Sequence, residues 1–298
     1  MIDRYGRIVD YLRLSLTDKC NLSCVYCSPQ DKKYKYNYIN DFMSTEDFKF
    51  IIKRFSENGI REIKFTGGEV LLHPDLPELV GYAKECGMKK ICITTNGTML
   101  RENILTLKEK GLTTVNINMD SLKRYKYKSV TRTGNINNVL DGIDACLSLG
   151  IDTNINCVVI NDFNNNEIDD FIHLTKNNPI NIRFIELLPN GEANKIYDRG
   201  HFDVEKIIEN LPNLEKVYNN DKNDNTEYYK IPGYTGKIGL LKDTEKNIYN
   251  KCNKIKISFD GKMKLYFSSE DEVDIKWLLH KNYLFDYQIK DYIWGKSK

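Results

Sequence analysis

Three cysteines near the N-terminus have a spacing that could hold a metal cluster. Cys20, Cys24 and Cys27 follow the pattern C-x3-C-x2-C in the segment DKCNLSCVYCSP. Three thiolates on one short loop can ligate three irons of a [4Fe–4S] cluster, because soft sulfur ligands suit iron–sulfur chemistry. The fourth iron is then open to a small molecule. A zinc site or a chance spacing is the alternative, although structural zinc sites usually have four protein ligands.

A second motif, Thr66-Gly67-Gly68-Glu69, follows a short run that is typical of a strand. Glycines at such a position let the backbone approach a ligand closely. A TGGE sequence alone usually marks a turn. Its place after a strand, downstream of the cysteine loop, makes it a candidate part of the same site.

Alternating segments are expected to position these motifs. Strands are predicted at Tyr11–Thr17, Glu62–Thr66, Lys90–Thr95, Thr114–Met119, Asn154–Ile160 and Asn181–Leu187, and helices at Thr45–Asn58, Leu76–Cys86, Glu102–Lys110, Ile136–Leu149 and Asn166–Lys176. Strand–helix units in series imply parallel strands, and six units are too few for a closed eight-stranded barrel. We expect an α/β fold, either an open partial barrel or a doubly wound sheet, with the ligand at the carboxyl ends of the strands.

The pattern of predicted strands and helices changes after about residue 200. Short strand-like runs are predicted at Glu227–Ile231, Lys237–Leu241, Lys254–Ser258 and Lys262–Phe267, and helices at Val273–Lys281 and Leu284–Trp294. Asp260 and Gly261 between two alternating runs predict a two-residue hairpin turn. We therefore expect a barrel over residues 1–200 and a small α+β extension over residues 201–298 that packs on it.

Composition limits the class of protein. The 298 residues include 41% hydrophobic and 29% charged side chains, with a formal net charge of +2. Such a balance argues against nucleic-acid binding through bulk charge, and no apolar run is long enough to span a membrane. Charged residues interrupt the N-terminal segment, so no secretory signal is expected and a cytoplasmic location follows. Cysteines in that compartment stay reduced unless they bind a metal or act in catalysis.

The cysteine loop and the TGGE motif together resemble those of the radical S-adenosylmethionine (SAM) superfamily. That resemblance implies a partial (β/α)6 barrel, one [4Fe–4S] cluster and SAM as cofactors. In this family the reduced cluster cleaves SAM, and the resulting 5′-deoxyadenosyl radical abstracts a hydrogen atom from the substrate. It also implies SAM contacts at these positions: Tyr26, Gly68, Glu69, Asn118 and Leu188. At the last two, Asn and Leu stand where the family carries Ser and Met.

Within the superfamily, the chain resembles the GTP 3′,8-cyclases of molybdenum-cofactor synthesis. The matching segments include GRIVDYLRLSLTDKCNLSCVYC, IKFTGGEVLLHPDL, ITTNGTML and RFIELLPNG. The resemblance implies substrate contacts at Arg13, Lys64 and Thr94. Lys64 stands where the family has Arg, which keeps the charge but loses the bidentate fork.

Other family positions differ more. The cyclases bind a second [4Fe–4S] cluster through three cysteines of the extension; here only Cys252 is present, with Tyr249 and Tyr266 at the other two positions. Two further Lys replace Arg, at Lys254 and Lys256, and Asn154 stands where a phosphate-contacting Lys is expected. One thiolate is a poor anchor, so the second cluster is expected to be absent.

These observations predict a radical SAM enzyme that acts on a nucleotide-like small molecule other than GTP. Three alternatives remain open: a peptide-modifying radical SAM enzyme, a GTP 3′,8-cyclase with a degenerate second site, and a non-catalytic iron–sulfur regulatory protein. An enzyme of this kind also needs an electron donor such as flavodoxin or ferredoxin.

Overall fold

Alternating strands and helices form most of the chain. The structure, a computed structural model, describes residues 1–3, 6–27, 42–189, 191–219, 223–242, 253–265 and 272–295. The first six strands are β1 (Tyr11–Ser15), β2 (Glu62–Thr66), β3 (Lys90–Thr95), β4 (Thr114–Asn118), β5 (Asp152–Val159) and β6 (Ile180–Glu186). The helices between them are α1 (Thr45–Glu57), α2 (Leu76–Glu85), α3 (Leu100–Lys110), α4 (Arg124–Thr131), α5 (Ile136–Ser148) and α6 (Ile168–Asn177). The predicted strands and helices are present to within two residues at nearly every boundary, whereas the sequence analysis missed α4.

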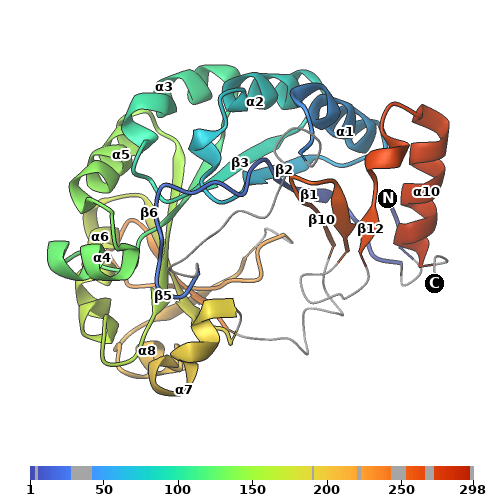
Figure 1. The fold of residues 1–298 in the computed structure, drawn as a ribbon. Coiled ribbons are helices and arrows are strands. Elements are labelled where there is room, and N and C mark those ends of the chain that lie inside the picture. The colour runs from blue at the N-terminus through green and yellow to red at the C-terminus, as the bar shows by residue number, and fades with distance from the viewer. Residues whose placement is uncertain are drawn as a thin grey trace.

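One curved sheet contains all the strands. Its order is β12-β11-β10-β1-β2-β3-β4-β5-β6-β9-β8-β7, and every neighbouring pair from β10 to β9 is parallel. In the described part of the chain the sheet has two edges, so the barrel is open. Figure 1 shows the helices around the outside of the arc and the strands inside it. This confirms the α/β fold with an open partial barrel that the sequence predicts.

The C-terminal extension lengthens the sheet at both edges. Strands β7 (Glu215–Val217), β8 (Glu227–Lys230) and β9 (Lys237–Leu241) join the β6 side, whereas β10 (Lys254–Ile257), β11 (Lys262–Lys264) and β12 (Val273–Asp274) join the β1 side. Among its described residues, the extension also contains the helices α7 (Tyr197–Gly200), α8 (Glu205–Glu209) and α10 (Asn282–Trp294). Phe285 of α10 packs edge-on against Phe55 of α1, with ring centroids 5.9 Å apart. The division at residue 200 stays a prediction.

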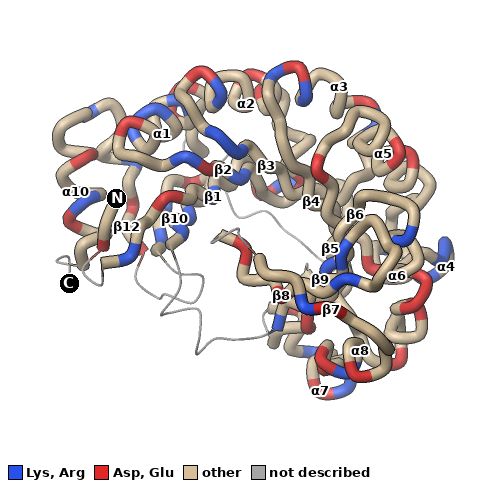
Figure 2. The backbone as a smooth tube through the Cα atoms, turned by 180° about the vertical axis from the view of Figure 1, so that it is seen from behind, with Lys and Arg blue, Asp and Glu red and all other residues tan. Residues whose placement is uncertain are grey.

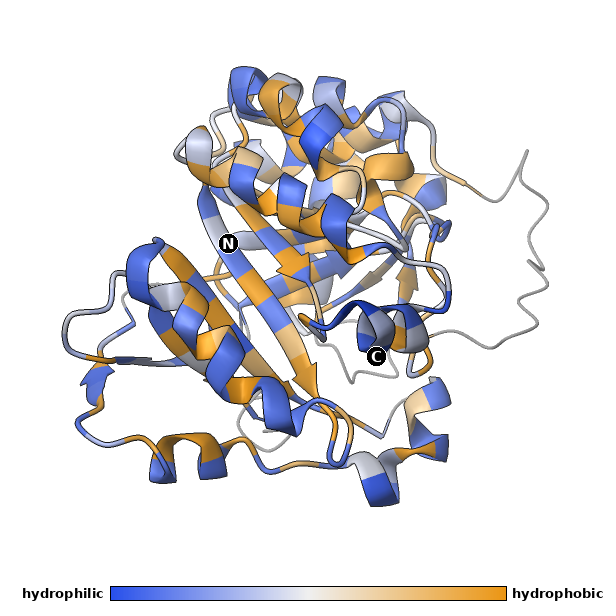
Figure 3. Cartoon of the chain, turned by 90° about the vertical axis from the view of Figure 1, so that its left-hand side faces the viewer, coloured by the Kyte–Doolittle hydropathy of each residue, from blue (hydrophilic) through white to orange (hydrophobic). Residues whose placement is uncertain are grey.

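Strand alternation separates a hydrophobic face from a polar one. Leu12 and Leu14 of β1 and Ile63 and Phe65 of β2 are fully buried beneath the helices. The residues between them face the concave side, because successive side chains of a strand point to opposite faces. Figure 3 shows this alternation of hydrophobic and hydrophilic positions along the strands. Helix burial therefore fixes which strand residues line the lumen of the open barrel.

Local signals set the ends of the helices. Ser44 and Asp47 form a capping box at the start of α1. Gly111 ends α3 with φ of 114°, a left-handed conformation that favours glycine. These caps provide partners for backbone groups at the helix ends that lack an intrahelical hydrogen bond.

Two predictions for the extension are wrong. Residues 273–281 form the short strand β12 and one 3-10 turn, Lys276–Leu278, because Val273 pairs with Met263 instead of continuing a helix. The hairpin between β10 and β11 has a three-residue loop, since the Ser258 amide donates to the Lys262 carbonyl, and Gly261 adopts φ of 81°. A search of the described helices for one long and apolar enough to cross a membrane found none.

Candidate active site

The cysteine loop leaves the carboxyl end of β1 and is fastened to neighbouring elements. The Leu16 amide donates to the Thr66 carbonyl at 2.9 Å, which ties the loop to the end of β2. The Val25 amide donates to the Val130 carbonyl at 3.0 Å, which ties it to α4. The helix that the sequence analysis missed therefore supports the loop that carries the cysteines.

The three loop thiols suit an iron–sulfur cluster. Cys20, Cys24 and Cys27 are not in disulfides, and Cys27 is exposed. Burial raises the pKa of Cys24, and the charges of Asp120, Cys27 and Cys20 raise it further. Neighbouring thiolates repel one another unless positive charge balances them. A cluster with one iron for each cysteine supplies that positive charge. Among the described residues, no three His, Cys, Asp or Glu side chains are grouped to hold a single metal ion.

The glycines of the TGGE motif allow β2 to pack directly against this loop. The Gly68 amide donates to the Thr17 carbonyl at 2.8 Å, and the Glu69 amide donates to the Lys19 carbonyl at 2.7 Å. A Cβ atom on Gly68 would lie 2.3 Å from the Lys19 carbonyl oxygen. Gly68 is therefore required by close packing, whatever else its backbone contacts.

The Glu69 side chain is turned inward and braces the next loop. It is fully buried, and its carboxylate accepts hydrogen bonds from Thr95 Oγ1 at 2.6 Å and from the amides of Asn96 at 2.7 Å and Leu71 at 3.0 Å. Burial raises the pKa of Glu69, while these hydrogen bonds oppose the rise. A SAM contact at Glu69 stays a prediction. Because the carboxylate already accepts three hydrogen bonds, we expect the backbone of Glu69 to make that contact.

Tyr26 is anchored to the end of β4. Its hydroxyl donates to Asp120 Oδ2 at 2.5 Å, and the Val158 amide donates to Asp120 Oδ1 at 2.9 Å. Burial raises the pKa of Asp120 to about 6. Asp120 thereby fixes the tyrosine that lies between Cys24 and Cys27.

The other two predicted SAM contacts lie at the same edge of the sheet. Asn118 is exposed at the carboxyl end of β4 and accepts a hydrogen bond from Asn156 Nδ2 at 3.0 Å. Leu188 is half-buried just beyond β6. Parallel strands bring these residues and the cysteine loop to one rim, although no direct contact between them is described.

Basic side chains line the lumen beneath that rim. The register pairs Arg13 with Lys64 on β2 and with Lys256 on β10. The ammonium groups of Lys64 and Lys254 lie 5.9 Å and 5.6 Å from the centre of the Tyr11 ring. Figure 2 shows basic residues on β10 and around β1 and β2. Three adjacent strands therefore present positive charge to one space.

Burial and the repulsion between neighbouring cations lower pKa values within this group. Burial lowers the pKa of Lys64 to about 8, and the neighbouring charges of Arg13, Arg183 and Lys254 lower it further. Burial likewise lowers the pKa of Arg13. The Nε atom of Arg13 is enclosed and has no hydrogen-bond partner. A buried donor without a partner is costly, which indicates a site for an anionic ligand.

Arg183 approaches the lumen from β6 and is held in a fixed orientation. Its guanidinium donates to Asp224 Oδ2 at 2.7 Å, to the Tyr228 hydroxyl at 2.6 Å and to Asn116 Oδ1 at 3.1 Å. The Asp224 charge raises the pKa of Arg183 against the effect of burial. The extension thus orients a barrel arginine, a role that the sequence analysis missed.

A ladder of amides crosses β6, β5 and β4 toward β3. Asn181 donates to Asn154 at 2.9 Å, Asn154 to Asn116 at 3.0 Å, and Asn116 to the Cys92 sulfur at 3.1 Å. Thr94 pairs in register with Asn116 and is half-buried. Asn154, expected to weaken phosphate binding, therefore takes part in a polar wall that contacts Arg183 through Asn116.

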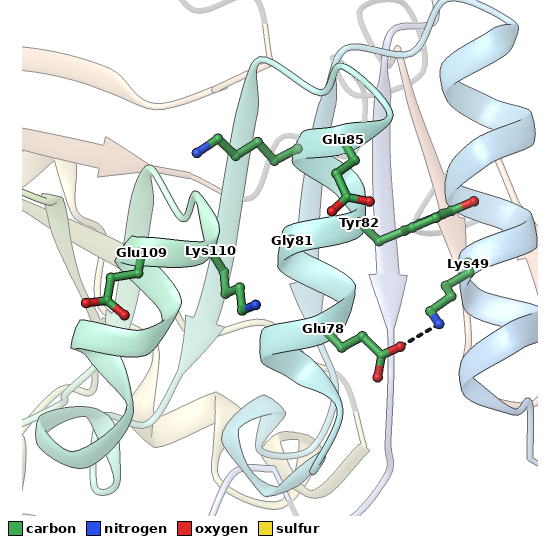
Figure 4. A pocket seen from close by; sticks show the side chains of 8 residues that line it. Lys49, Glu78, Gly81, Tyr82, Glu85, Glu109 and Lys110 are labelled. Atoms are coloured by element: carbon green, nitrogen blue, oxygen red, sulfur yellow. Dashed lines mark ion pairs between the residues drawn. The ribbon is translucent and has the colours of Figure 1, made fainter.

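A surface pocket of about 760 Å³ lies elsewhere, over the outer helices. Figure 4 shows its lining side chains on α1, α2 and α3, with Lys49 and Glu78 in an ion pair at 2.5 Å. It mixes acidic and basic residues and contains none of the motif residues. We therefore place the candidate site in the lumen. Cys252, Tyr249 and Tyr266, on which the prediction about a second cluster depends, lie outside the described residues.

Comparison with known families identifies the chemistry of this site. The family model "Radical SAM superfamily" matches residues 14–175, more than half of the chain, and includes the cysteine loop and the TGGE motif. The chain belongs to the radical SAM superfamily. A second model, "Molybdenum Cofactor Synthesis C", matches residues 180–298 of this radical SAM enzyme. A [4Fe–4S] cluster and SAM are the cofactors that this family implies.

Curated relatives place the enzyme in the GTP 3′,8-cyclase-like branch. It is 38% identical over 278 residues to the GTP 3′,8-cyclase of Peptoclostridium acidaminophilum, covering 92% of this chain and 85% of that one. It is also 38% identical over 298 residues to the GTP 3′,8-cyclase of Clostridium botulinum strain Langeland, covering 99% and 93%. These relatives favour the GTP alternative over the expected non-GTP substrate.

Solved structures support the fold alone. Streptococcus suis SuiB bound to S-adenosylmethionine matches with a TM-score of 0.60 at 13% identity, over 97% of this chain and 65% of that one. SuiB bound to its precursor peptide SuiA matches with a TM-score of 0.66 at 14% identity, covering 97% and 66%. The chain spans about 65% of the SuiB chain, and such low identity carries no information on substrate.

The sequence analysis missed several site residues, among them Asn96, Asp120, Arg183 and Cys92. Asn96, whose amide donates to Glu69, lies in the ITTNG segment and also donates to Asn21 Oδ1 at 2.7 Å. Its position after a strand was a usable signal. The lumen position of Cys92 could not be recognised without the strand register, because an apolar flanking sequence usually indicates a buried inert thiol.

Proposed function

We propose that this radical SAM enzyme acts on GTP and closes a bond between the ribose C3′ and the purine C8, as the name of its curated relatives states for those proteins. The single observation that carries the proposal is the group of basic lumen side chains around the unpartnered Arg13 Nε. A triphosphate supplies the negative charge that such a group favours.

The residues of the chain divide into two groups with separate tasks. At the rim, Cys20, Cys24 and Cys27 would hold the [4Fe–4S] cluster, and Tyr26, Gly68, Glu69, Asn118 and Leu188 are proposed to bind SAM. When bound, the reduced cluster supplies the electron that cleaves SAM and so initiates hydrogen abstraction from the substrate. An external one-electron donor such as flavodoxin or ferredoxin is part of this proposal.

Below the rim, the lumen residues would orient the nucleotide. Arg13 and Lys64 are proposed to neutralise phosphate oxygens, while Arg183 is held by Asp224 and Tyr228 so that its guanidinium loses little freedom on binding. Thr94 offers a hydroxyl on the neighbouring strand. Fixed donors of this kind position a substrate without reorganisation during the reaction.

The test is product analysis under anaerobic conditions. Reconstituted enzyme is incubated with GTP, SAM and dithionite, and 5′-deoxyadenosine and the cyclised purine nucleotide are quantified by mass spectrometry. We expect both products together. Formation of 5′-deoxyadenosine without any cyclised nucleotide would contradict the GTP assignment, and absence of both would contradict the enzymatic function.

A nucleotide other than GTP is the second candidate. Only one cysteine, Cys252, lies beyond residue 200, so the extension lacks the three-cysteine set through which the cyclases bind a second cluster. Parallel incubations with ATP, UTP and CTP test this candidate. A product from one of these nucleotides, with none from GTP, would favour it.

A further inference from the structure

We propose that Cys92 donates a hydrogen atom to the substrate-derived radical that remains after ring closure. This inference rests on the function proposed above and assigns one further catalytic residue to it. It follows from the position of the thiol, from the neighbours of that thiol, and from the electron count of the reaction.

Cys92 lies in the wall of the lumen. It occupies β3 between Ile91 and Ile93, both of which are buried beneath the helices, so its side chain points to the concave side. The register pairs it with Lys64, which in turn pairs with Arg13. Cys92 is therefore on the same level of the barrel as two of the proposed phosphate-binding residues.

Two hydrogen bonds orient the Cys92 side chain. The Cys92 Sγ–H group donates to the Ile93 carbonyl oxygen at 3.4 Å, and Asn116 Nδ2 donates to the sulfur at 3.1 Å. Asn116, the member of the amide ladder that contacts Cys92, also accepts a hydrogen bond from the Arg183 guanidinium. The thiol is thus connected to the residues that would orient the nucleotide.

A second observation points to a ligand beside the thiol. Cys92 is electrostatically coupled to Lys64, Arg13 and Arg183, so the sulfur lies close to all three cationic side chains. The enclosed Arg13 Nε has no partner. An anionic group that satisfies Arg13 would therefore be bound close to Cys92.

The other buried thiols lack this arrangement. Cys157 on β5 pairs in register with Phe184, is buried on the helix side and accepts a hydrogen bond from Asn164. Cys146 lies within α5. Among the described cysteines outside the cysteine loop, only Cys92 occupies a strand position that faces the lumen.

After ring closure the substrate radical must gain one hydrogen atom, or one electron and one proton, to become a closed-shell product. Abstraction of one hydrogen atom leaves a radical on the ribose, and bond formation to C8 moves the unpaired electron onto the purine. A closed-shell product forms when the Cys92 S–H bond breaks and its hydrogen atom pairs with that electron. The resulting sulfur radical returns to the thiol by accepting one electron from the low-potential donor of the assay and one proton, for which the Lys64 ammonium is the neighbouring source.

The test compares Cys92→Ser with Cys157→Ser as a matched control. A serine hydroxyl keeps a donor for Ile93 and an acceptor for Asn116, but its O–H bond is too strong to give up a hydrogen atom. For Cys92→Ser we expect unchanged GTP binding by the apo protein and continued 5′-deoxyadenosine formation. The yield of cyclised nucleotide per 5′-deoxyadenosine should fall by about tenfold or more.

Freeze-quenched electron paramagnetic resonance gives an independent readout. Cys92→Ser should accumulate an organic radical during turnover, whereas the native enzyme and Cys157→Ser should not. If Cys92→Ser keeps the native product ratio and accumulates no radical, the role of Cys92 is wrong and the GTP function stands. If the native enzyme forms no cyclised nucleotide, both the proposed function and the role of Cys92 are wrong.

Discussion

Gly68→Ala should separate folding from cofactor chemistry, because the added Cβ meets only the backbone of the cysteine loop. That Cβ would lie 2.3 Å from the Lys19 carbonyl oxygen and 2.5 Å from the Asp18 carbonyl oxygen. Reaching ordinary contact distance requires the loop to retreat by about 1 Å. The retreat also strains the hydrogen bonds that Gly68 and Glu69 donate to this loop.

The magnitude follows from this geometry. Overpacking of a well-packed site costs about 1–3 kcal/mol, and for a chain of this size each 1 kcal/mol lowers Tm by about 2–4 °C. A misplacement of about 1 Å at a catalytic group can reduce the rate by about 100-fold. We therefore expect a folded variant with a slightly lower Tm and a large loss of SAM cleavage.

The assay measures the Tm of the apo protein by circular dichroism and the rate of 5′-deoxyadenosine formation after anaerobic reconstitution. Gly81→Ala in α2 is the matched control. Its Cβ would meet only the flexible Lys110 side chain, at 3.4 Å, and both residues are visible in Figure 4. Alanine within a helix should leave stability unchanged or raise it by about 0.5–1 kcal/mol. Native rates of SAM cleavage in Gly68→Ala would refute the reasoning.

Three further outcomes are expected. Arg13→Gln should raise the Kd for GTP about 10- to 100-fold in equilibrium titrations, because a charge-assisted contact is lost, and an unchanged Kd would remove Arg13 from the site. Affinity for GTP should fall as pH rises through about 8, where Lys64 loses its proton. Lys64→Arg, which stays charged, should flatten that profile; persistence of the same fall would assign it to another group. Glu69→Gln places an amide NH2 group against donors that need an acceptor. This variant should lower the free energy of unfolding of the apo protein by about 1–3 kcal/mol in urea unfolding. Equal stability would show that the carboxylate does not brace the loop.

Short-range patterns explain why much of the barrel could be predicted. The alternation of apolar residues in β1 and β2, and the capping box at Ser44, depend on residues a few positions apart. The cysteine spacing likewise fits within one loop. Each of these features requires only local chemistry, so the elements and the candidate cluster ligands could be predicted before the fold was known.

Helix α4 and β12 show the limit of such patterns. Residues of α4 are polar and lack a strong apolar stripe, and its role becomes clear through the backbone bonds that Val130 and Thr131 accept from the cysteine loop. The sequence predicts a helix over Val273–Lys281, yet pairing of Val273 with Met263 across the sheet makes its first residues a strand. In both cases a partner distant in sequence decides the structure.

The sequence by itself determined the cysteine triad, the glycine-rich motif and the series of strand–helix units. Tertiary structure alone decided that Cys92, Asn116 and Arg183 meet in the lumen, and that Asp224 from the extension holds the arginine. The physical reason is that strand register and the pairing of β9 with β6 are set by burial of the opposite, apolar face of the sheet. The polar residues that meet in the lumen carry no pattern of their own that would reveal their neighbours.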